Sequence, residues 1–245
     1  MANETSGGNA KISVIIPAYK AENSIAPCVQ SVLDQDFDDI EILVVNDCSP
    51  DRTRQVIEDS FANDLRVRLI NPNQNVGVHA ARRIGVAAST GNYIGFVDAD
   101  DYVQPDMYST LLKRMTDDNS SIAICSAALV SEGKRLSVQR IKIRRSDTVR
   151  KDVLAAFCRL KFGSGVLWNK LYKREVIEGP ALMELERAVD GSEDYIVNFG
   201  AFARADTVSL CPEPLYNYVA HSASLSAEKG WTAFCRLFRA YVVCL

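Results

Sequence analysis

The chain has 245 residues, of which 47% are hydrophobic and 24% are charged. This composition excludes intrinsic disorder for most of the chain and is enough for one large domain or two small ones. The 28 basic and 31 acidic side chains leave a net charge of −3. General nucleic-acid binding needs a strongly basic surface, so we expect no nucleic-acid partner.

Four short runs rich in β-branched residues predict buried strands in the first hundred residues. These runs are 12–16, 40–45, 67–70 and 93–97. Apolar residues at helical spacing predict the intervening helices at 23–36, 51–62 and 78–89. The alternating order with short links predicts a parallel sheet with helices on both faces. Residues 1–10 are small and polar, and we expect a disordered tail without a signal peptide.

The second half has a less regular pattern. Helices are predicted at 106–117, 148–161, 193–204 and 229–244. Extended segments are predicted at 121–130, 133–145, 166–172 and 207–219. Because no Pro/Gly/Ser-rich linker or internal repeat interrupts the chain, we expect one compact domain over 11–220, followed by a C-terminal segment and helix over 221–245.

Seven cysteines without a CxxC pair indicate buried thiols in a reducing compartment, so a cytoplasmic protein is expected. No run of apolar residues approaches the ~18 that a membrane span needs. A peripheral position at the inner face of a membrane is the alternative. It would use either of two surfaces: the basic run 134–145, or an apolar stripe on the helix at 229–244. The simpler interpretations are a charged sheet edge and packing of the helix on its own domain.

Polar residues follow three of the predicted strands, where ligands bind in open parallel sheets. Tyr19 comes after the first strand, Asp47 after the second, and the turn 98–101 (DADD) after the fourth. No glycine-rich phosphate loop follows any strand, so a phosphate-bearing ligand would need a divalent cation. Three acids within four residues repel one another unless a cation binds them; the alternative is an exposed acidic turn.

Taken together and in order, these motifs resemble family 2 glycosyltransferases of the GT-A fold. The matching segments are 15–19 (IIPAY), 44–51 (VVNDCSPD), 75–77 (NVG), 81–82 (AR), 96–101 (FVDADD), 168–173 (WNKLYK) and 193–194 (ED). The resemblance implies an α/β, Rossmann-like, mostly parallel central sheet flanked by helices, with a small C-terminal helical appendage. It also implies a nucleotide-binding half at 11–105 and an acceptor half at 106–220.

The activity implied by the resemblance is a metal-dependent, inverting transfer of a sugar from a nucleotide diphosphate to a hydroxyl group. The commonest donor among similar sequences is a UDP-sugar. The acceptor would be a saccharide or a lipid-linked molecule, in cell-envelope or extracellular polysaccharide synthesis.

The resemblance also assigns roles to individual residues. Those expected at the donor are Pro17, Tyr19, Asp47, Asn75, Arg82, Asp98 and Asp100. Tyr19 would stack on the base and Asp47 would accept a hydrogen bond from it. Arg82 would lie near the nucleotide. The simpler alternatives are a strand cap for Tyr19, a cap of the helix at 51–62 for Asp47, a turn residue for Asn75 and a surface charge for Arg82.

The expected metal ligands for Mn²⁺ or Mg²⁺ are Asp98, Asp100 and His221, and an ordinary surface position is the alternative for His221. Asp194 matches the family's catalytic base, which takes the proton of the acceptor hydroxyl. Residues expected at the acceptor are Trp168, Asn169 and Glu193. Core and turn positions for Trp168 and Asn169, and favourable acids at a helix start for Glu193 and Asp194, are the alternatives.

Three rival functions are weighed against the transferase. The segment 96–100 also fits the hhhDxD strand of a haloacid-dehalogenase-type phosphatase, but that motif usually ends the first strand and is followed by Thr or Val where this chain has Tyr102. A sugar nucleotidylyltransferase would carry a glycine-rich loop after the first strand. A catalytically silent nucleotide-sugar binding module would lack the base or the DxD pair, and both are present.

Overall fold

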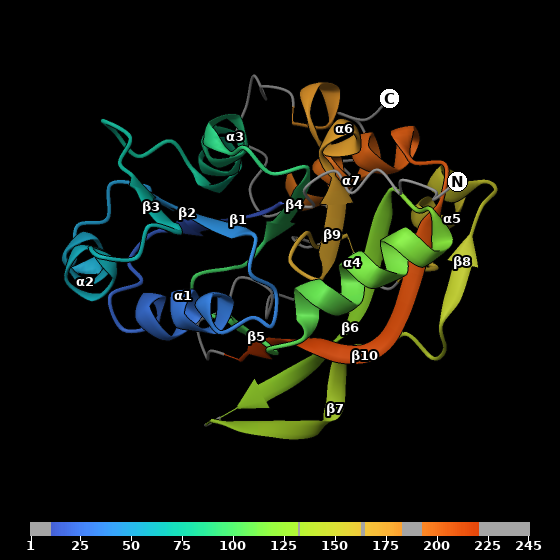
Figure 1. Ribbon diagram of the computed structural model, residues 1–245, viewed down its shortest axis with the longest axis horizontal. Helices are drawn as coiled ribbons and strands as arrows, with labels where there is room; N and C mark the ends of the chain where they lie inside the picture. Colours follow the sequence, from blue (N-terminus) through green and yellow to red (C-terminus); the bar gives the residue numbers. More distant parts are fainter. Residues whose placement is uncertain (1–10, 132, 163–164, 183–192, 221–245) are drawn as a thin grey trace, which may run out of the picture.

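The computed structural model describes residues 11–131, 133–162, 165–182 and 193–220 (Figure 1). Within these ranges ten strands form one sheet, whose main path runs β3-β2-β1-β4-β9-β6-β10-β5, while β7 pairs with β6 and β8 with β10. Two hydrophobic clusters cover the opposite faces of this sheet. Neighbouring residues of β1 divide between them: Val14 and Ile16 join one cluster and Ile15 the other, as the two-residue period of a buried strand requires.

The first half confirms the predicted alternation of strands and helices. Its strands are β1 (Ile12–Ala18), β2 (Ile40–Asn46), β3 (Val67–Ile70) and β4 (Tyr93–Phe96). Its helices are α1 (Ile25–Leu33), α2 (Thr53–Phe61) and α3 (Val78–Ala88). All four strands are parallel. Figure 1 shows α1 and α3 on opposite faces of this part of the sheet.

The second half extends the same sheet with strands of both directions. Its strands are β5 (Tyr102–Val103), β6 (Ile122–Ser131), β7 (Lys134–Ile141), β8 (Asp147–Val149), β9 (Lys170–Lys173) and β10 (Val208–Val219). Its helices are α4 (Met107–Asp118), α5 (Val153–Cys158), α6 (Arg174–Ile177), the 3₁₀ helix η1 (Gly179–Leu182) and α7 (Glu193–Arg204). Strand β9 lies antiparallel between β4 and β6 and joins the two halves into one sheet.

Two predicted elements are wrong in extent. The helix predicted over 148–161 is only α5, because residues 147–149 pair with β10 as β8 and the backbone of Asp152 (φ 51°) breaks the path between them. The extended segment predicted over 166–172 is a strand only from Lys170. The predicted tail 1–10, the helix 229–244 and His221 lie outside the described residues. None of the helices in the described part of the chain is long and apolar enough to cross a membrane.

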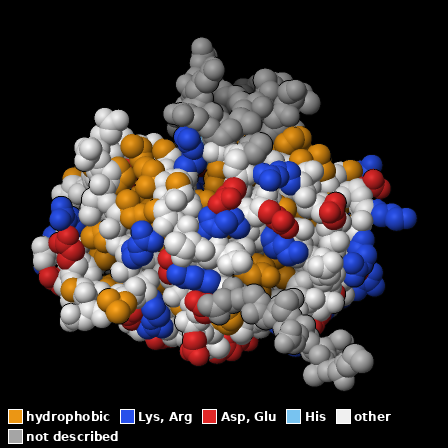
Figure 2. Space-filling model, turned by 45° about the horizontal axis from the view of Figure 1, so that its top comes forward, with side chains coloured by type: hydrophobic (Ala, Val, Ile, Leu, Met, Phe, Trp, Pro, Cys, Tyr) orange, Lys and Arg blue, Asp and Glu red, His pale blue; other side chains and the backbone are white. Residues whose placement is uncertain are grey.

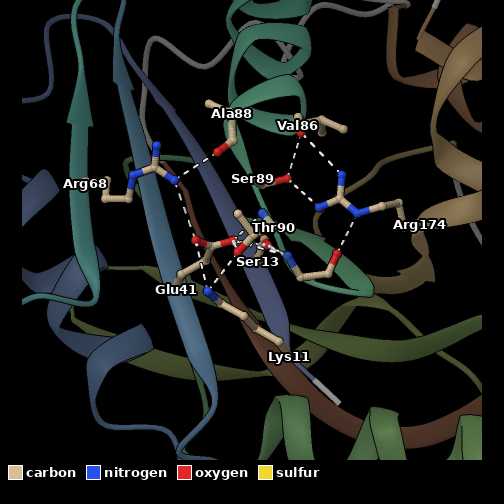
Figure 3. Close-up of polar contacts among 10 residues, drawn as sticks. Lys11, Ser13, Glu41, Arg68, Val86, Ala88, Ser89, Thr90 and Arg174 are labelled. Atoms are coloured by element: carbon tan, nitrogen blue, oxygen red, sulfur yellow. Dashed lines mark hydrogen bonds and ion pairs between the residues drawn. The ribbon is translucent and has the colours of Figure 1, made fainter. Parts of the chain in front are cut away.

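A buried carboxylate fastens the end of the sheet opposite the predicted site. Glu41 of β2 accepts hydrogen bonds from Ser13, Thr90 and Gly91, and Lys11 and Arg68 lie near its second oxygen (Figure 3). These bonds hold the chain where it leaves α3 and enters β4. The other end of α3 begins next to Asp47, which follows β2 and accepts the amides of Val76 and Gly77.

Candidate active site

The loops after β1 and β2 are joined to each other by hydrogen bonds. The amide of Lys20 donates to Ser49, and the amide of Ala21 donates to Thr53 at the start of α2. Tyr19 stands at the tip of the first loop with half of its surface exposed, and the ammonium of Lys20 lies 5.3 Å from its ring centroid. An exposed ring on a fixed loop is suited to stacking against a planar ligand.

Asp47 fixes the segment that leads into α3. Its two carboxylate oxygens accept the amides of Val76 (2.7 Å) and Gly77 (2.9 Å), while its carbonyl accepts the side-chain amide of Asn75. Gly77 has φ +82°, a backbone conformation that favours glycine. The helix-cap alternative for Asp47 is wrong, because Asp51 accepts the amide of Thr53 at the start of α2.

Arg82 is the central cation of the site. It lies on α3, which packs so closely on the sheet that a Cβ on Gly85 would come 2.4 Å from a methyl group of Ile15. Its side chain is 4% exposed, and its guanidinium forms ion pairs with Asp98 (3.1 Å), after β4, and with Asp194, on α7. The surface-charge alternative for Arg82 is therefore wrong. The buried guanidinium of Arg82 therefore connects one carboxylate from each half of the chain.

The acidic turn after β4 is held by the last strand of the sheet. The hydroxyl of Tyr216 on β10 accepts the amide of Asp98 and donates to the buried carboxylate of Asp101 (2.7 Å). Asp101 also accepts the amide of Val219. These bonds leave Asp98 partly exposed and Asp100 exposed at the edge of the sheet.

Asp194 lies in the first turn of α7, where the helix N-terminus favours a negative charge. One of its oxygens accepts from Arg82 and the other accepts the amide of Leu167 (3.3 Å). The side-chain amide of Asn198, one turn later on α7, donates to the carbonyls of Gly165, Val166 and Asp194. The segment before β9 and the start of α7 therefore position this carboxylate together. Glu193 is partly exposed beside it.

The structure buries the other two residues predicted for the acceptor. Trp168 is 3% exposed and stacks on Tyr216, with ring centroids 4.2 Å apart. Asn169 is fully buried, donates to the carbonyl of Cys125 and accepts from the ammonium of Lys170. Their side chains support the site from beneath, and any effect on an acceptor would be indirect.

The carboxyl groups of the acidic turn raise one another's pKa values. Burial, together with the charges of Asp194 and Asp100, outweighs Arg82 and raises the pKa of Asp98 to about 6. Burial and the charge of Asp98 likewise raise the pKa of Asp101 to about 8. When neighbouring carboxylates repel one another, a bound cation stabilises their ionised forms. Within the described residues no cluster of three or more metal-ligating side chains occurs.

Four supporting residues were not predicted as part of the site. Asp101, Tyr216, Lys170 and Asn198 hold the acidic turn or the segment around Asp194. Asp101 and Lys170 stand inside the motifs that carried the family resemblance, which was a usable signal. The sequence carried no such signal for Tyr216 and Asn198, because an aromatic residue in a strand and an asparagine in a helix suggest ordinary packing.

Comparison with known proteins places this geometry in a family. A family profile described as "Glycosyl transferase family 2" matches residues 13–179. The chain belongs to glycosyl transferase family 2. The uncharacterized glycosyltransferase EpsJ of Bacillus subtilis is 33% identical over 88% of this chain and 62% of its own length. The succinoglycan biosynthesis protein ExoO of Rhizobium meliloti is 28% identical, again over 88% of this chain and 62% of its own length. This chain therefore spans less than two thirds of these relatives.

Among solved structures, that of S. aureus TarS 1–349 in complex with UDP-GlcNAc superimposes with a TM-score of 0.78 at 21% sequence identity. The match covers 96% of this chain and 65% of that one. The fold is therefore GT-A, as predicted. Membership of this family also argues against the phosphatase alternative.

Proposed function

We propose that this chain is a metal-dependent, inverting glycosyltransferase that moves a sugar from a UDP-sugar to an acceptor hydroxyl. The observation that carries the proposal is the position of Arg82 between Asp98 and Asp194. The guanidinium of Arg82 contacts both the acidic turn of the predicted donor half and the predicted base in the acceptor half, so the two lie close together. Transfer needs that proximity, because the acceptor oxygen must meet the anomeric carbon while its proton is removed.

Asp194 is the proposed general base. A carboxylate oxygen can accept more than one hydrogen bond, so the contacts from Arg82 and Leu167 hold the group while leaving it able to accept from a hydroxyl. The acceptor hydroxyl would lose its proton to Asp194 as its oxygen bonds to the anomeric carbon. The bond from that carbon to the diphosphate breaks at the same time, and UDP leaves from the opposite side.

The donor would lie across the loops after β1, β2 and β4. The exposed ring of Tyr19 suits stacking on a base, and Pro17, which pairs with Val45 near the end of β1, is proposed as a neighbouring donor contact. Asp47 and Asn75 shape the opposite wall, since their contacts fix the segment before α3. Structures of the S. aureus neighbour with UDP-GlcNAc and with UDP support a uridine nucleotide here.

The acidic turn fits a divalent cation. Asp98 and Asp100 offer the hard oxygen donors that Mg²⁺ and Mn²⁺ prefer, and such ions commonly take one or two carboxylates and complete their shell with substrate phosphates. When bound, the cation would neutralise charge on the leaving diphosphate. His221 remains a proposed third ligand.

Acceptor contacts are assigned to Glu193, which borders Asp194 at the rim of the site. Trp168 and Asn169 are proposed as positioning residues, because their buried side chains hold the segment that orients Asp194. The name of the relative ExoO supports a role in polysaccharide synthesis, with a saccharide or lipid-linked acceptor.

The test is UDP binding measured by calorimetry, together with release of UDP from a panel of UDP-sugars. We expect UDP to bind much more tightly with Mn²⁺ than with EDTA. Asp100→Asn should remove most of that difference. The control variant Asp106→Asn, at an exposed position directly before α4, should not. Equal affinity in Mn²⁺ and EDTA would exclude the metal site. A wild-type chain that binds no nucleotide under any condition would exclude the transferase.

A further inference from the structure

Strand β7 presents an unusual outer surface. Beyond Gln139, Arg140, Lys142 and Arg144 are exposed, while Ile141 and Ile143 are buried in the two hydrophobic clusters on opposite faces of the sheet. We call the exposed side chains of this segment the β7 face, and its members are Lys134, Arg135, Leu136, Val138, Arg140, Lys142 and Arg144. Figure 1 shows β7 and the end of β6 projecting below the rest of the sheet. The face therefore belongs to a protruding hairpin.

The charge of this hairpin strand has one sign. Residues 133–146 contain six cations and no acid, although the whole chain carries a net charge of −3. Five of these cations belong to the β7 face, and Arg145 follows it directly. On the face that Figure 2 presents, basic and acidic side chains are interspersed. A local concentration of positive charge on an acidic protein indicates an anionic partner.

The β7 face also exposes apolar side chains. Val138 is 65% exposed and Leu136 is 43% exposed, and they are two residues apart on one strand. Edge strands commonly carry charges that prevent pairing with other chains, and this function alone would favour polar residues at these two positions. Exposed aliphatic groups between cations are instead typical of surfaces that enter the interface of a bilayer.

The β7 face is connected to the active site through aromatic rings. The guanidinium of Arg140 lies 5.2 Å from the ring centroid of Tyr218 on β10. Tyr218 stacks with Trp168, which stacks on Tyr216, and the hydroxyl of Tyr216 accepts the amide of Asp98. A surface bound at β7 would therefore hold a fixed relation to the acidic turn.

We propose that the β7 face docks this chain on the surface of an anionic lipid bilayer. The cations attract the headgroups, and Leu136 and Val138 enter the boundary with the acyl chains. A soluble anionic glycan would satisfy the cations but gives no reason to expose the two aliphatic side chains, so the bilayer is the better match. The proposal goes beyond the transferase activity and does not depend on it.

The experiment is co-sedimentation of the full chain with vesicles of phosphatidylcholine alone or mixed with phosphatidylglycerol. The wild type should bind the mixed vesicles, bind the neutral ones far less, and release as salt rises. The double variant Lys142→Gln/Arg144→Gln should lower the partition coefficient about 25-fold, since each cation near an anionic surface contributes roughly fivefold. Leu136→Ser/Val138→Ser should also weaken binding.

A matched control removes two exposed cations from the loop after α5. Arg159→Gln/Lys161→Gln should bind mixed vesicles nearly as the wild type does. Circular dichroism and UDP affinity should be unchanged in every variant, which separates loss of docking from loss of folding or of donor binding. The proposal is overturned if the wild type ignores anionic vesicles, if the control loses as much binding as the β7 variants, or if the β7 variants bind normally. Concentration-dependent dimers that the Leu136/Val138 variant abolishes, without vesicle binding, would assign the face to a second copy of the chain instead.

Discussion

Glu41 gives the sharpest quantitative test of how the scaffold holds the active-site helix. Its carboxylate accepts the hydroxyl of Ser13 at 2.6 Å, the amide of Thr90 at 2.6 Å and the amide of Gly91 at 3.2 Å (Figure 3). Lys11 and Arg68 lie 3.4 and 3.6 Å from its other oxygen. Glu41→Gln keeps the shape of the side chain but removes the charge that all these donors share.

The magnitude follows from the pKa of Glu41. Burial alone would raise this pKa, but the hydrogen bonds from Ser13 and Thr90 and the charge of Lys11 outweigh burial and lower it from 4.5 to about 2. At about 1.4 kcal/mol per pKa unit, and reduced because the two cations are partly exposed, the ionised carboxylate contributes about 2 to 3 kcal/mol of stability. The pKa is lower in the folded chain than in the unfolded chain. The contribution is therefore complete above about pH 4.5 and is lost as the pH falls toward 2.

The assay is urea unfolding of the wild type and Glu41→Gln at a series of pH values. We expect the variant to be less stable by about 2 to 3 kcal/mol at pH 7, with the difference shrinking as the pH falls below about 4.5. The matched control is Glu58→Gln, which breaks an exposed pair with Arg54 and should cost less than about 0.5 kcal/mol. A difference between wild type and Glu41→Gln that stays constant from pH 7 to pH 3 would refute the reasoning.

Three further variants test contacts closer to the site. Arg82→Met leaves the carboxylates of Asp98 and Asp194 without their shared cation and should destabilise the fold by about 3 to 5 kcal/mol in urea unfolding; a smaller loss than that of an exposed arginine would contradict the ion-pair geometry. Gly85→Ala forces α3 away from β1 and should cost about 1 to 3 kcal/mol, which an unchanged melting temperature would disprove. Tyr216→Phe leaves two buried polar partners unsatisfied, so we expect about 1 to 3 kcal/mol of destabilisation and weaker Mn²⁺-dependent UDP binding; unaltered calorimetry would show that the acidic turn does not need this hydroxyl.

Local sequence patterns predicted the first half of the fold well. Runs such as 93–97 are apolar on both faces, and each is followed by a helical pattern, so strand direction and order follow from the short connections. The second half depends on pairing that no local pattern encodes. Strand β9 is short, and it inserts between β4 and β6 only because the tertiary structure brings both edges together. The same applies to β8, which interrupts a helical pattern in order to pair with β10.

The site shows a similar division. Asp47, Asp98 and Asp100 were singled out because they follow predicted strands, whereas the roles of Arg82 and Asp194 came from the family resemblance. What the sequence could not show is which charges meet. Arg82 and Asp194 are 112 residues apart, and their ion pair requires both the close approach of α3 to β1 and the position of α7. The support from Tyr216 to the acidic turn spans a similar distance along the chain.

The central claim is that Asp194 acts on the acceptor while the first half holds the donor. Asp194→Asn tests it most directly, because the amide oxygen can still accept from Arg82 while the proton acceptor is lost. UDP affinity and the rate of sugar transfer should be measured side by side, with the exposed Asp206→Asn on the loop after α7 as control. We predict UDP affinity close to that of the wild type and transfer reduced by roughly 10²–10⁴-fold, with neither changed in the control. Full transfer by Asp194→Asn, or loss of its UDP binding with the fold intact, would contradict the account.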